Sequence, residues 1–187
     1  MKRYYYTAIT TIIIQVLIVF SVLEALAAQP VAPAGAQKYR VTAVHDGDTV
    51  SIRAKSFAGI PLKIERVRLI GIDAPELKQE QWGMKAKRHL KKLISESDWV
   101  ITAELDAEQR DKYGRLLAYL WGRDGRLINE KMLEAGYAML FTFPPNVKYA
   151  DRFVEAQKRA QLRRSGIWKA GGLRESPHKW REKHPRK

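Results

Sequence analysis

The chain has 187 residues, no cysteine, and 34 lysines and arginines against 20 aspartates and glutamates, which gives a formal net charge of +14. This length suits one domain with a true hydrophobic core, and the lack of cysteine excludes a disulfide framework and a thiolate metal site. So large a positive charge attracts polyanions, either nucleic acid or anionic lipid, but it does not decide between them.

The N-terminal segment has the features of a targeting sequence. Lys2 and Arg3 precede an apolar run over residues 8–22, and the small residues Ala25-Leu26-Ala27 follow it. This pattern predicts a signal peptide over residues 1–27 and a secreted or cell-envelope protein. The alternative is an uncleaved membrane anchor with an extracytoplasmic domain, although the run is shorter than the roughly 18 apolar residues that span a bilayer. A disordered spacer rich in proline and alanine is expected over residues 28–38.

Apolar alternation predicts five strands and helical periodicity predicts three helices within one domain over residues 39–168. The strands are expected over Tyr39–Val44, Thr49–Arg53, Lys63–Ile72, Trp99–Leu105 and Arg115–Trp121, and the helices over Gln81–Ser95, Asn129–Gly136 and Lys148–Ser165. The predicted fold class is α+β, mainly β: a five-stranded oligonucleotide-binding (OB) barrel with three helices. Residues 54–61 are expected to form a hairpin tip, and the basic residues 169–187 a disordered tail.

Three polar clusters lie where predicted strands end or begin. They are Asp46-Gly47-Asp48-Thr49, the run from Arg68 to Glu76, and Asp111-Lys112-Tyr113-Gly114-Arg115. Side chains at such positions converge without filling the core; carboxylates there provide hard oxygen ligands, and the planar fork of arginine suits a phosphate. Any one cluster is also compatible with an ordinary turn, but the three together indicate phosphoryl chemistry.

The same clusters carry a resemblance to a known family. Residues 39–168 resemble the staphylococcal nuclease (thermonuclease) family, with its motifs in order: Asp-Gly-Asp-Thr at 46–49, Arg-x-x-x-x-Asp-x-Pro-Glu at 68–76, Asp-Lys-Tyr-Gly-Arg at 111–115, Leu-Ile-Asn-Glu at 127–130 and Gly-Ile-Trp at 166–168. The resemblance implies an OB-fold endonuclease that uses Ca²⁺ to hydrolyse DNA and RNA, with single-stranded or frayed substrates preferred. The resemblance also implies little sequence specificity, and products with 5′-hydroxyl and 3′-phosphate ends.

The resemblance implies a metal site built from oxygen ligands. Ca²⁺ would be held by Asp48, Asp73 and the main-chain carbonyl of Ala74. The family often has threonine at the last position, and a carbonyl ligand survives that change. Asp46 is expected beside the site, where it would hold the turn or a metal-bound water.

The resemblance also implies the catalytic roles. Glu76 corresponds to the general base that orients and deprotonates the attacking water. Arg68 and Arg115 correspond to a paired clamp on the scissile phosphate, whose charge-assisted hydrogen bonds strengthen as charge builds in the transition state.

Four further residues align with substrate contacts of the family. Lys112 and Tyr113 match positions near the bound nucleotide, while Phe141 and Phe143 align with two tyrosines of the nucleotide pocket. A phenyl ring still stacks on a base, but it makes no hydroxyl bond to the substrate. The alternative for both phenylalanines is plain core packing.

Two other functions compete with a secreted nuclease. Barrels of this family also occur as noncatalytic nucleic-acid or protein binders, although such copies typically lose the carboxylates that are retained here. An envelope-bound protein that grips anionic lipid is the other alternative. A monomer without an obligate protein partner is expected, with a membrane contact only if the N-terminal segment is not cleaved.

Overall fold

The protein is described from a computed structural model, which describes residues 15, 32–33, 36–53 and 63–185. Residues 1–31 and 32–187 form two separate units, and all that follows concerns the second. Apart from Gln15, the predicted signal peptide lies outside the described residues, as does the predicted hairpin tip over 54–61. Within the described ranges, no helix has the length and apolar character needed to cross a membrane.

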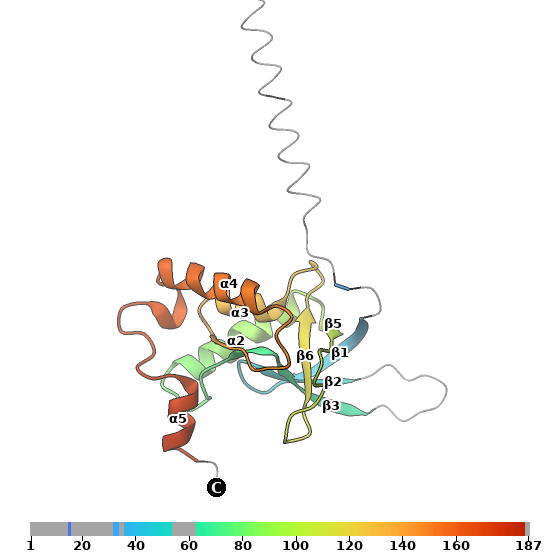
Figure 1. Ribbon diagram of the computed structural model, residues 1–187, viewed down its shortest axis with the longest axis horizontal. Coiled ribbons are helices and arrows are strands. Elements are labelled where there is room, and N and C mark those ends of the chain that lie inside the picture. Colours follow the sequence, from blue (N-terminus) through green and yellow to red (C-terminus); the bar gives the residue numbers. More distant parts are fainter. Residues whose placement is uncertain (1–14, 16–31, 34–35, 54–62, 186–187) are drawn as a thin grey trace, which may run out of the picture. The chain divides into compact units, whose positions relative to one another are not determined.

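Five strands close into a barrel in the order β1-β2-β3-β6-β5 (Figure 1). Neighbouring strands are antiparallel except β3 and β6, which run parallel with Arg68 opposite Leu117. This barrel, with helices packed against it, confirms the predicted OB architecture. The barrel strands are β1 (Gln37–Val44), β2 (Thr49–Arg53), β3 (Ile64–Leu69), β5 (Val100–Glu104) and β6 (Leu116–Trp121).

The first strand begins earlier than expected. Composition predicts that residues 37 and 38 belong to the spacer, but Gln37 pairs with Ala103 and Lys38 with Thr102 of β5. The partner strand lies more than sixty residues further along the chain, so the local sequence carries no sign of this pairing. The spacer prediction is therefore wrong at these two residues.

The predicted single strand over Lys63–Ile72 is two strands. β3 ends at Leu69, and β4 (Gly71–Asp73) leaves the barrel to pair with β7 (Met139–Phe141) in a small two-stranded sheet. The break lies at Gly71, whose φ of +79° is readily adopted only by glycine, and an added Cβ there would lie 2.5 Å from the ring of Phe153. This change of direction carries Asp73 out of the barrel wall.

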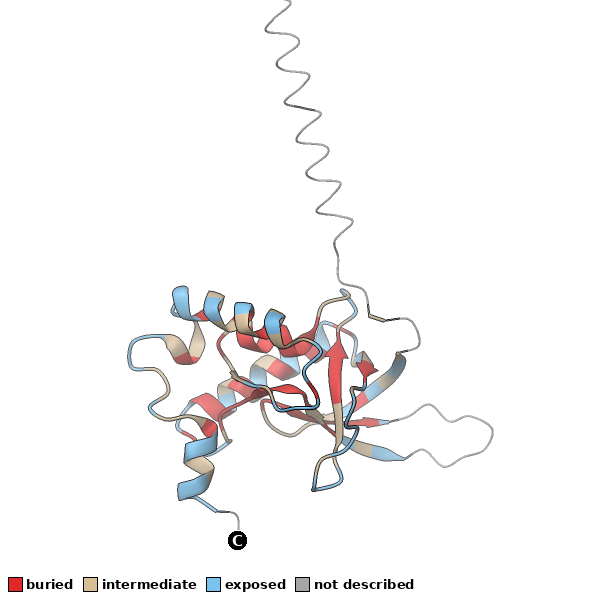
Figure 2. Cartoon of the chain, in the orientation of Figure 1, coloured by how far each residue is buried: buried red, intermediate tan, exposed pale blue. Residues whose placement is uncertain are grey.

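The described residues between 32 and 185 form four helices, where the sequence predicts three, and a short 3₁₀ helix. They are α2 (Trp82–Ser95), α3 (Ile128–Glu134), α4 (Ala150–Leu162), η1 (Gly166–Trp168) and α5 (Pro177–Lys183). Figure 2 shows the outer side of α4 exposed and its inner side buried, as expected for an amphipathic helix against a core.

The additional helix, α5, lies in the segment that composition predicted to be a disordered tail. Its start has a clear local cause, because Pro177 occupies the first turn and the Ser176 hydroxyl accepts a hydrogen bond from the Lys179 amide, 3.3 Å away. The prediction of a disordered tail is thus wrong for these residues.

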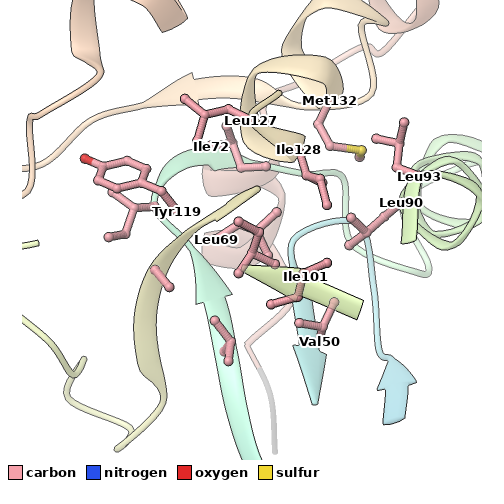
Figure 3. Close-up of a cluster of buried hydrophobic side chains, with 14 of the residues drawn as sticks. Val50, Leu69, Ile72, Leu90, Leu93, Ile101, Tyr119, Leu127, Ile128 and Met132 are labelled. Carbon is pink, nitrogen blue, oxygen red and sulfur yellow. The ribbon is translucent and has the colours of Figure 1, made fainter. Parts of the chain in front are cut away.

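The core fills the barrel and the layer between the barrel and its covering helices (Figure 3). The strands contribute β-branched and leucine side chains from alternate positions, and α2 and α3 contribute the apolar sides of their helices. Representative buried members are Val50, Leu69, Ile101, Leu90, Leu93, Ile128 and Met132.

Asn129 is a fully buried polar residue that joins two elements of the core. Its Oδ1 accepts a hydrogen bond from the Leu120 amide at 2.9 Å, and its Nδ2 donates to the Ile70 carbonyl at 2.8 Å. The amide side chain thereby satisfies one backbone group of β6 and one at the break between β3 and β4. Both groups would otherwise be buried without a partner.

We expect Asn129→Ala to lower the free energy of unfolding by about 2–4 kcal/mol, because it leaves two buried backbone groups unpaired. Urea unfolding followed by circular dichroism measures this. Lys131→Ala is the matched control on the same helix, since it removes only an ion pair with Asp124 and should cost less than about 1 kcal/mol. Equal losses in the two variants would contradict the bridging role of Asn129.

Candidate active site

The turn between β1 and β2 carries the first acidic cluster. The Asp46 carboxylate accepts a hydrogen bond from the Asp48 amide at 3.0 Å, which fixes the turn. A Cβ on Gly47 would lie 2.5 Å from the Cβ of Ala74 and 2.7 Å from that of Ala86. Glycine therefore lets this turn approach both the second acidic cluster and α2.

Asp48 binds the second cluster through its side chain and its backbone. Its Oδ2 accepts a hydrogen bond from the Ala74 amide at 2.8 Å, and its carbonyl accepts one from the Leu69 amide at 2.9 Å. Its Oδ1 accepts from the Thr49 hydroxyl at 3.0 Å. Asp48 and Asp73 are 25 positions apart in the sequence, and their two motifs thus form one site.

Arg68 lies between the two predicted metal-ligand carboxylates. Its Nη2 donates to Asp73 Oδ1 at 3.0 Å, and its Nη1 forms an ion pair with Asp48. Burial by itself would lower the pKa of Arg68, but the charges of Asp48, Asp73 and then Asp46 raise it above its ordinary value. Arg68 therefore joins the carboxylates of Asp48 and Asp73, which come from different parts of the chain.

The pKa of Asp46 is raised to about 6, first by burial and then by the negative charge of Asp48. An amide hydrogen bond from Asp48 and the charge of Arg68 act in the opposite direction. Asp46 and Asp48 therefore form a close pair of carboxylates, in which a second negative charge is unfavourable.

Glu76 is held by the loop that leads into α2. Its amide donates to Oε1 of Gln79 at 3.2 Å, and its carbonyl accepts from the Gln79 amide at 2.7 Å. The Glu76 side chain is 18% exposed, so its carboxylate reaches solvent at the edge of the site. The structure thus places Glu76 at the edge of the acidic site, where its carboxylate contacts the same guanidinium as Asp73.

A third arginine, which the sequence did not predict in the site, comes from α5. Arg181 donates from Nη1 to Asp73 Oδ1 at 3.0 Å and from Nη2 to Asp73 Oδ2 at 2.8 Å, and its Nη1 also lies 3.1 Å from Glu76 Oε1. Burial alone would lower the pKa of Arg181, but hydrogen bonds and charges from Asp73, and then from Glu76, raise it above its usual value. The serine and proline that begin α5 are a sequence signal for the helix, but no local pattern directs Arg181 to this site.

The third cluster forms a loop organised by Asp111. Its Oδ1 accepts from the amides of Tyr113 at 2.9 Å and Arg115 at 3.0 Å, and its Oδ2 accepts from Arg115 Nε at 2.7 Å. The next residue begins β6, which pairs with the strand that carries Arg68. Asp111 therefore fixes the direction of the Arg115 guanidinium, a positioning role that the sequence analysis missed.

Lys112 and Tyr113 lie on the outer part of the same loop. The Tyr113 ring is 73% exposed, with the Lys112 ammonium 5.2 Å and the Arg115 guanidinium carbon 5.6 Å from its centroid. An exposed ring flanked by two cations suits a surface that meets a polyanion.

Phe141 and Phe143 are surface residues and not core residues. They are 44% and 71% exposed, which decides against core packing. Phe141 ends β7 and pairs with Gly71, so the small sheet joins its backbone to the strand that carries Asp73. Its ring centroid lies 6.4 Å from that of His178 in α5.

The donor set fits a hard cation through two carboxylates and the neighbouring main chain. Asp48 and Asp73 share the Arg68 fork, and Asp48 is bonded to the amide of Ala74, so the three predicted ligands are neighbours. In the described ranges, no group of three or more His, Asp or Glu side chains is arranged to hold a metal ion by itself. The predicted set of two carboxylates and one main-chain carbonyl consists of oxygen atoms, the kind of ligand that Ca²⁺ prefers.

A closed five-stranded barrel, with carboxylates and arginines at adjacent strand ends, defines an OB-fold protein equipped for phosphoryl chemistry. Residues 66–170 match the family described as Staphylococcal nuclease homologue. The chain belongs to the staphylococcal nuclease family.

Curated relatives support this membership across most of the chain. A protein named Thermonuclease from Staphylococcus hyicus is 34% identical over 145 residues, which cover 72% of this chain and 78% of that protein. Thermonuclease from Staphylococcus intermedius is 37% identical over 137 residues, covering 71% and 76% respectively. Endonuclease YncB from Bacillus subtilis (strain 168) is 32% identical over 134 residues, covering 68% of this chain and 59% of that protein.

Proposed function

We propose that this protein is a Ca²⁺-dependent endonuclease that hydrolyses phosphodiester bonds of DNA and RNA. The observation that carries the proposal is that Asp48, Asp73 and Glu76 meet at one edge of an OB barrel. The names of the relatives, Thermonuclease and Endonuclease, agree with this chemistry. A noncatalytic binder would have no use for three carboxylates at the site where a phosphate must approach.

Asp48, Asp73 and the Ala74 carbonyl would hold the cation, and Asp46 would support the turn that carries Asp48. Bound Ca²⁺ supplies a positive charge that offsets the charge developing on the phosphoryl oxygens. The chain's own arginine, Arg68, adds a fixed positive charge between the two carboxylates.

Glu76 orients a water molecule and accepts its proton as the water oxygen attacks phosphorus. The bond from phosphorus to the 5′ oxygen then breaks, and this oxygen takes a proton from solvent water, which leaves a 3′-phosphate and a 5′-hydroxyl. Arg68 and Arg115 donate to the phosphoryl oxygens, and Asp111 keeps the guanidinium of Arg115 in a single orientation.

Exposed aromatic rings would bind the nucleotides that flank the scissile bond. Tyr113, Phe141 and Phe143 offer faces for stacking, and Lys112 offers a charge for a neighbouring phosphate. Stacking tolerates every base, so the cleavage should depend little on sequence, and unstacked single strands should be preferred. Extracytoplasmic location remains part of the proposal and rests on the N-terminal sequence alone.

The test is digestion of denatured DNA by the purified protein in millimolar Ca²⁺ and again with excess chelator. We expect cleavage only with Ca²⁺, and a loss of at least about 100-fold in Asp48→Ala, since even residues around a metal ligand contribute 10–100-fold. Asp48→Asn, which still accepts the Ala74 hydrogen bond, should fold normally and lose activity similarly. Asp151→Ala, an exposed carboxylate on α4, is the control that should keep activity.

Cleavage that persists in chelator, or in both Asp48 variants with Ca²⁺ present, would contradict the metal site. Tight DNA binding without cleavage by the unaltered protein would instead favour the noncatalytic alternative.

A further inference from the structure

The C-terminal segment is attached to the acidic site through a buried glutamine. Gln79 is 1% exposed; its Oε1 accepts from the Glu76 amide, and its Nε2 donates to the Glu175 carbonyl at 2.8 Å. One side chain therefore joins the loop of the predicted general base to the residues that precede α5. In Figure 1, α5 lies beside this loop, which leads into α2.

Two more contacts fix the segment before and within α5. The Leu173 amide donates to the Ile167 carbonyl at 3.2 Å, and Lys183 forms an ion pair with Glu175 at 2.6 Å. The second contact joins Lys183, the last residue of α5, to Glu175, which precedes the helix. Together with Gln79, these bonds give the helix a defined place against the site.

Arg181 takes the positions on Asp73 that a cation would need. Both oxygens of Asp73 accept hydrogen bonds from its guanidinium, at 3.0 and 2.8 Å, and Oδ1 also accepts one from Arg68. The same guanidinium lies 3.1 Å from Glu76. A cation on Asp73 would compete with Arg181 for the same two carboxylate oxygens, so binding of one disfavours the other.

The same helix also lies over a residue proposed to bind substrate. The ring of His178 is 6.4 Å from that of Phe141, with an angle of 44° between the planes. One short element therefore contacts a predicted metal ligand, the predicted base and a predicted stacking residue.

We propose that α5 is an autoinhibitory element, in which Arg181 stands in for the metal ion on Asp73 and Glu76. This inference rests on the proposed function, since it concerns the same carboxylates. Cation binding requires α5 to leave, and its departure also uncovers Phe141 for the nucleic acid.

The helix is suited to release because little of it is buried. α5 has seven residues, of which only Pro177 is buried. A helix this short is marginal by itself, so most of its stability comes from its contacts with the site. Those contacts are largely charged hydrogen bonds, which a divalent cation competes for directly.

Calorimetric titration of the full-length protein with CaCl₂, without nucleic acid, tests the competition. We expect Arg181→Gln to tighten Ca²⁺ binding by about tenfold or more, because charge-assisted hydrogen bonds no longer compete for Asp73. Lys179→Gln removes the same charge from an exposed position of the same helix and should change the affinity by less than about twofold. An affinity in Arg181→Gln that is unchanged or weaker than in the unaltered protein would overturn the proposal.

The absence of cysteine allows a second test by site-specific labelling. Spin labels at Lys91→Cys on α2 and Lys179→Cys on α5, both exposed positions, should give one narrow distance distribution in chelator by double electron–electron resonance. Saturating Ca²⁺ should broaden and lengthen it, and the labelled Arg181→Gln protein should show the broad distribution without Ca²⁺. A distance that stays narrow with Ca²⁺ bound would overturn the proposal.

These tests separate the inference from the proposed function. Equal Ca²⁺ binding by the unaltered protein and Arg181→Gln, lost in Asp48→Ala, would overturn autoinhibition while the metal site stands. Tighter binding in Arg181→Gln without cleavage by any variant would support the competition and refute the nuclease. No Ca²⁺ binding by any of these proteins would overturn both.

Discussion

Glu76→Gln is expected to lower the single-turnover rate on denatured DNA by about 10²–10⁴-fold, the usual contribution of a positioned general base. Glutamine keeps the shape of the side chain and accepts the hydrogen bond from Arg181, but it does not accept a proton from water. DNA binding, measured by fluorescence anisotropy, should be retained. The loss of a negative charge also weakens the attachment of α5, so binding should be equal or tighter.

The matched control is Glu80→Gln, an exposed glutamate in the same loop. It removes the same charge four residues away and should leave both the rate and the DNA affinity within about twofold, as is usual for an exposed, screened charge. A rate in Glu76→Gln equal to that of this control would remove Glu76 from the chemical step.

Arg115→Ala is expected to cost about 2.7–4 kcal/mol of transition-state stabilisation, or roughly 10²–10³-fold in kcat, by comparison with the removal of one oxyanion donor. The reason is that Asp111 holds Nε at 2.7 Å and orients the planar group before substrate arrives. Arg115→Lys should recover little of this, because an ammonium lacks the fork that matches two phosphoryl oxygens. Rates at saturating denatured DNA measure the effect.

Arg110 provides the control on the same loop. It pairs with Glu65 at 3.0 Å and donates to the Gly114 carbonyl at 2.8 Å, so Arg110→Ala removes the same charge without touching the predicted clamp. A similar loss of kcat in both variants would show that loop structure or overall charge, and not the guanidinium of Arg115, accounts for the effect.

Arg115 and Arg181 differ in how far the local sequence predicts their contacts. The motif around Arg115 is local, because Asp111 reaches the amides of its own loop, and the sequence alone predicts both the loop and the strand that follows. Arg181 reaches Asp73 across 108 positions of the chain, and its helix was mistaken for a disordered tail. A composition rich in charged residues predicts a solvent-exposed segment. It does not show that one of these side chains, such as Arg181, forms an ion pair with a residue far away in the sequence.

Local sequence patterns predict the barrel strands and the acidic residues that the structure brings together. Period-two alternation predicts the barrel strands, and the structure confirms them where the strands follow simple pleated geometry. The Asp-Gly-Asp turn and the run ending in Glu76 are local patterns as well, and the roles assigned to their residues stay predictions. For Phe141 and Phe143, the sequence does not decide between stacking on a base and packing in the core.

The other features follow from the folded structure, because each depends on a partner far along the chain. The chain turns at Gly71 so that β4 pairs with β7, nearly seventy residues later, and Phe141 at the end of β7 is exposed. Gln79 and Arg181 bring the C-terminal helix to the site through hydrogen bonds that span about a hundred residues. Such contacts follow from the geometry of the folded barrel, and no window of local sequence contains them.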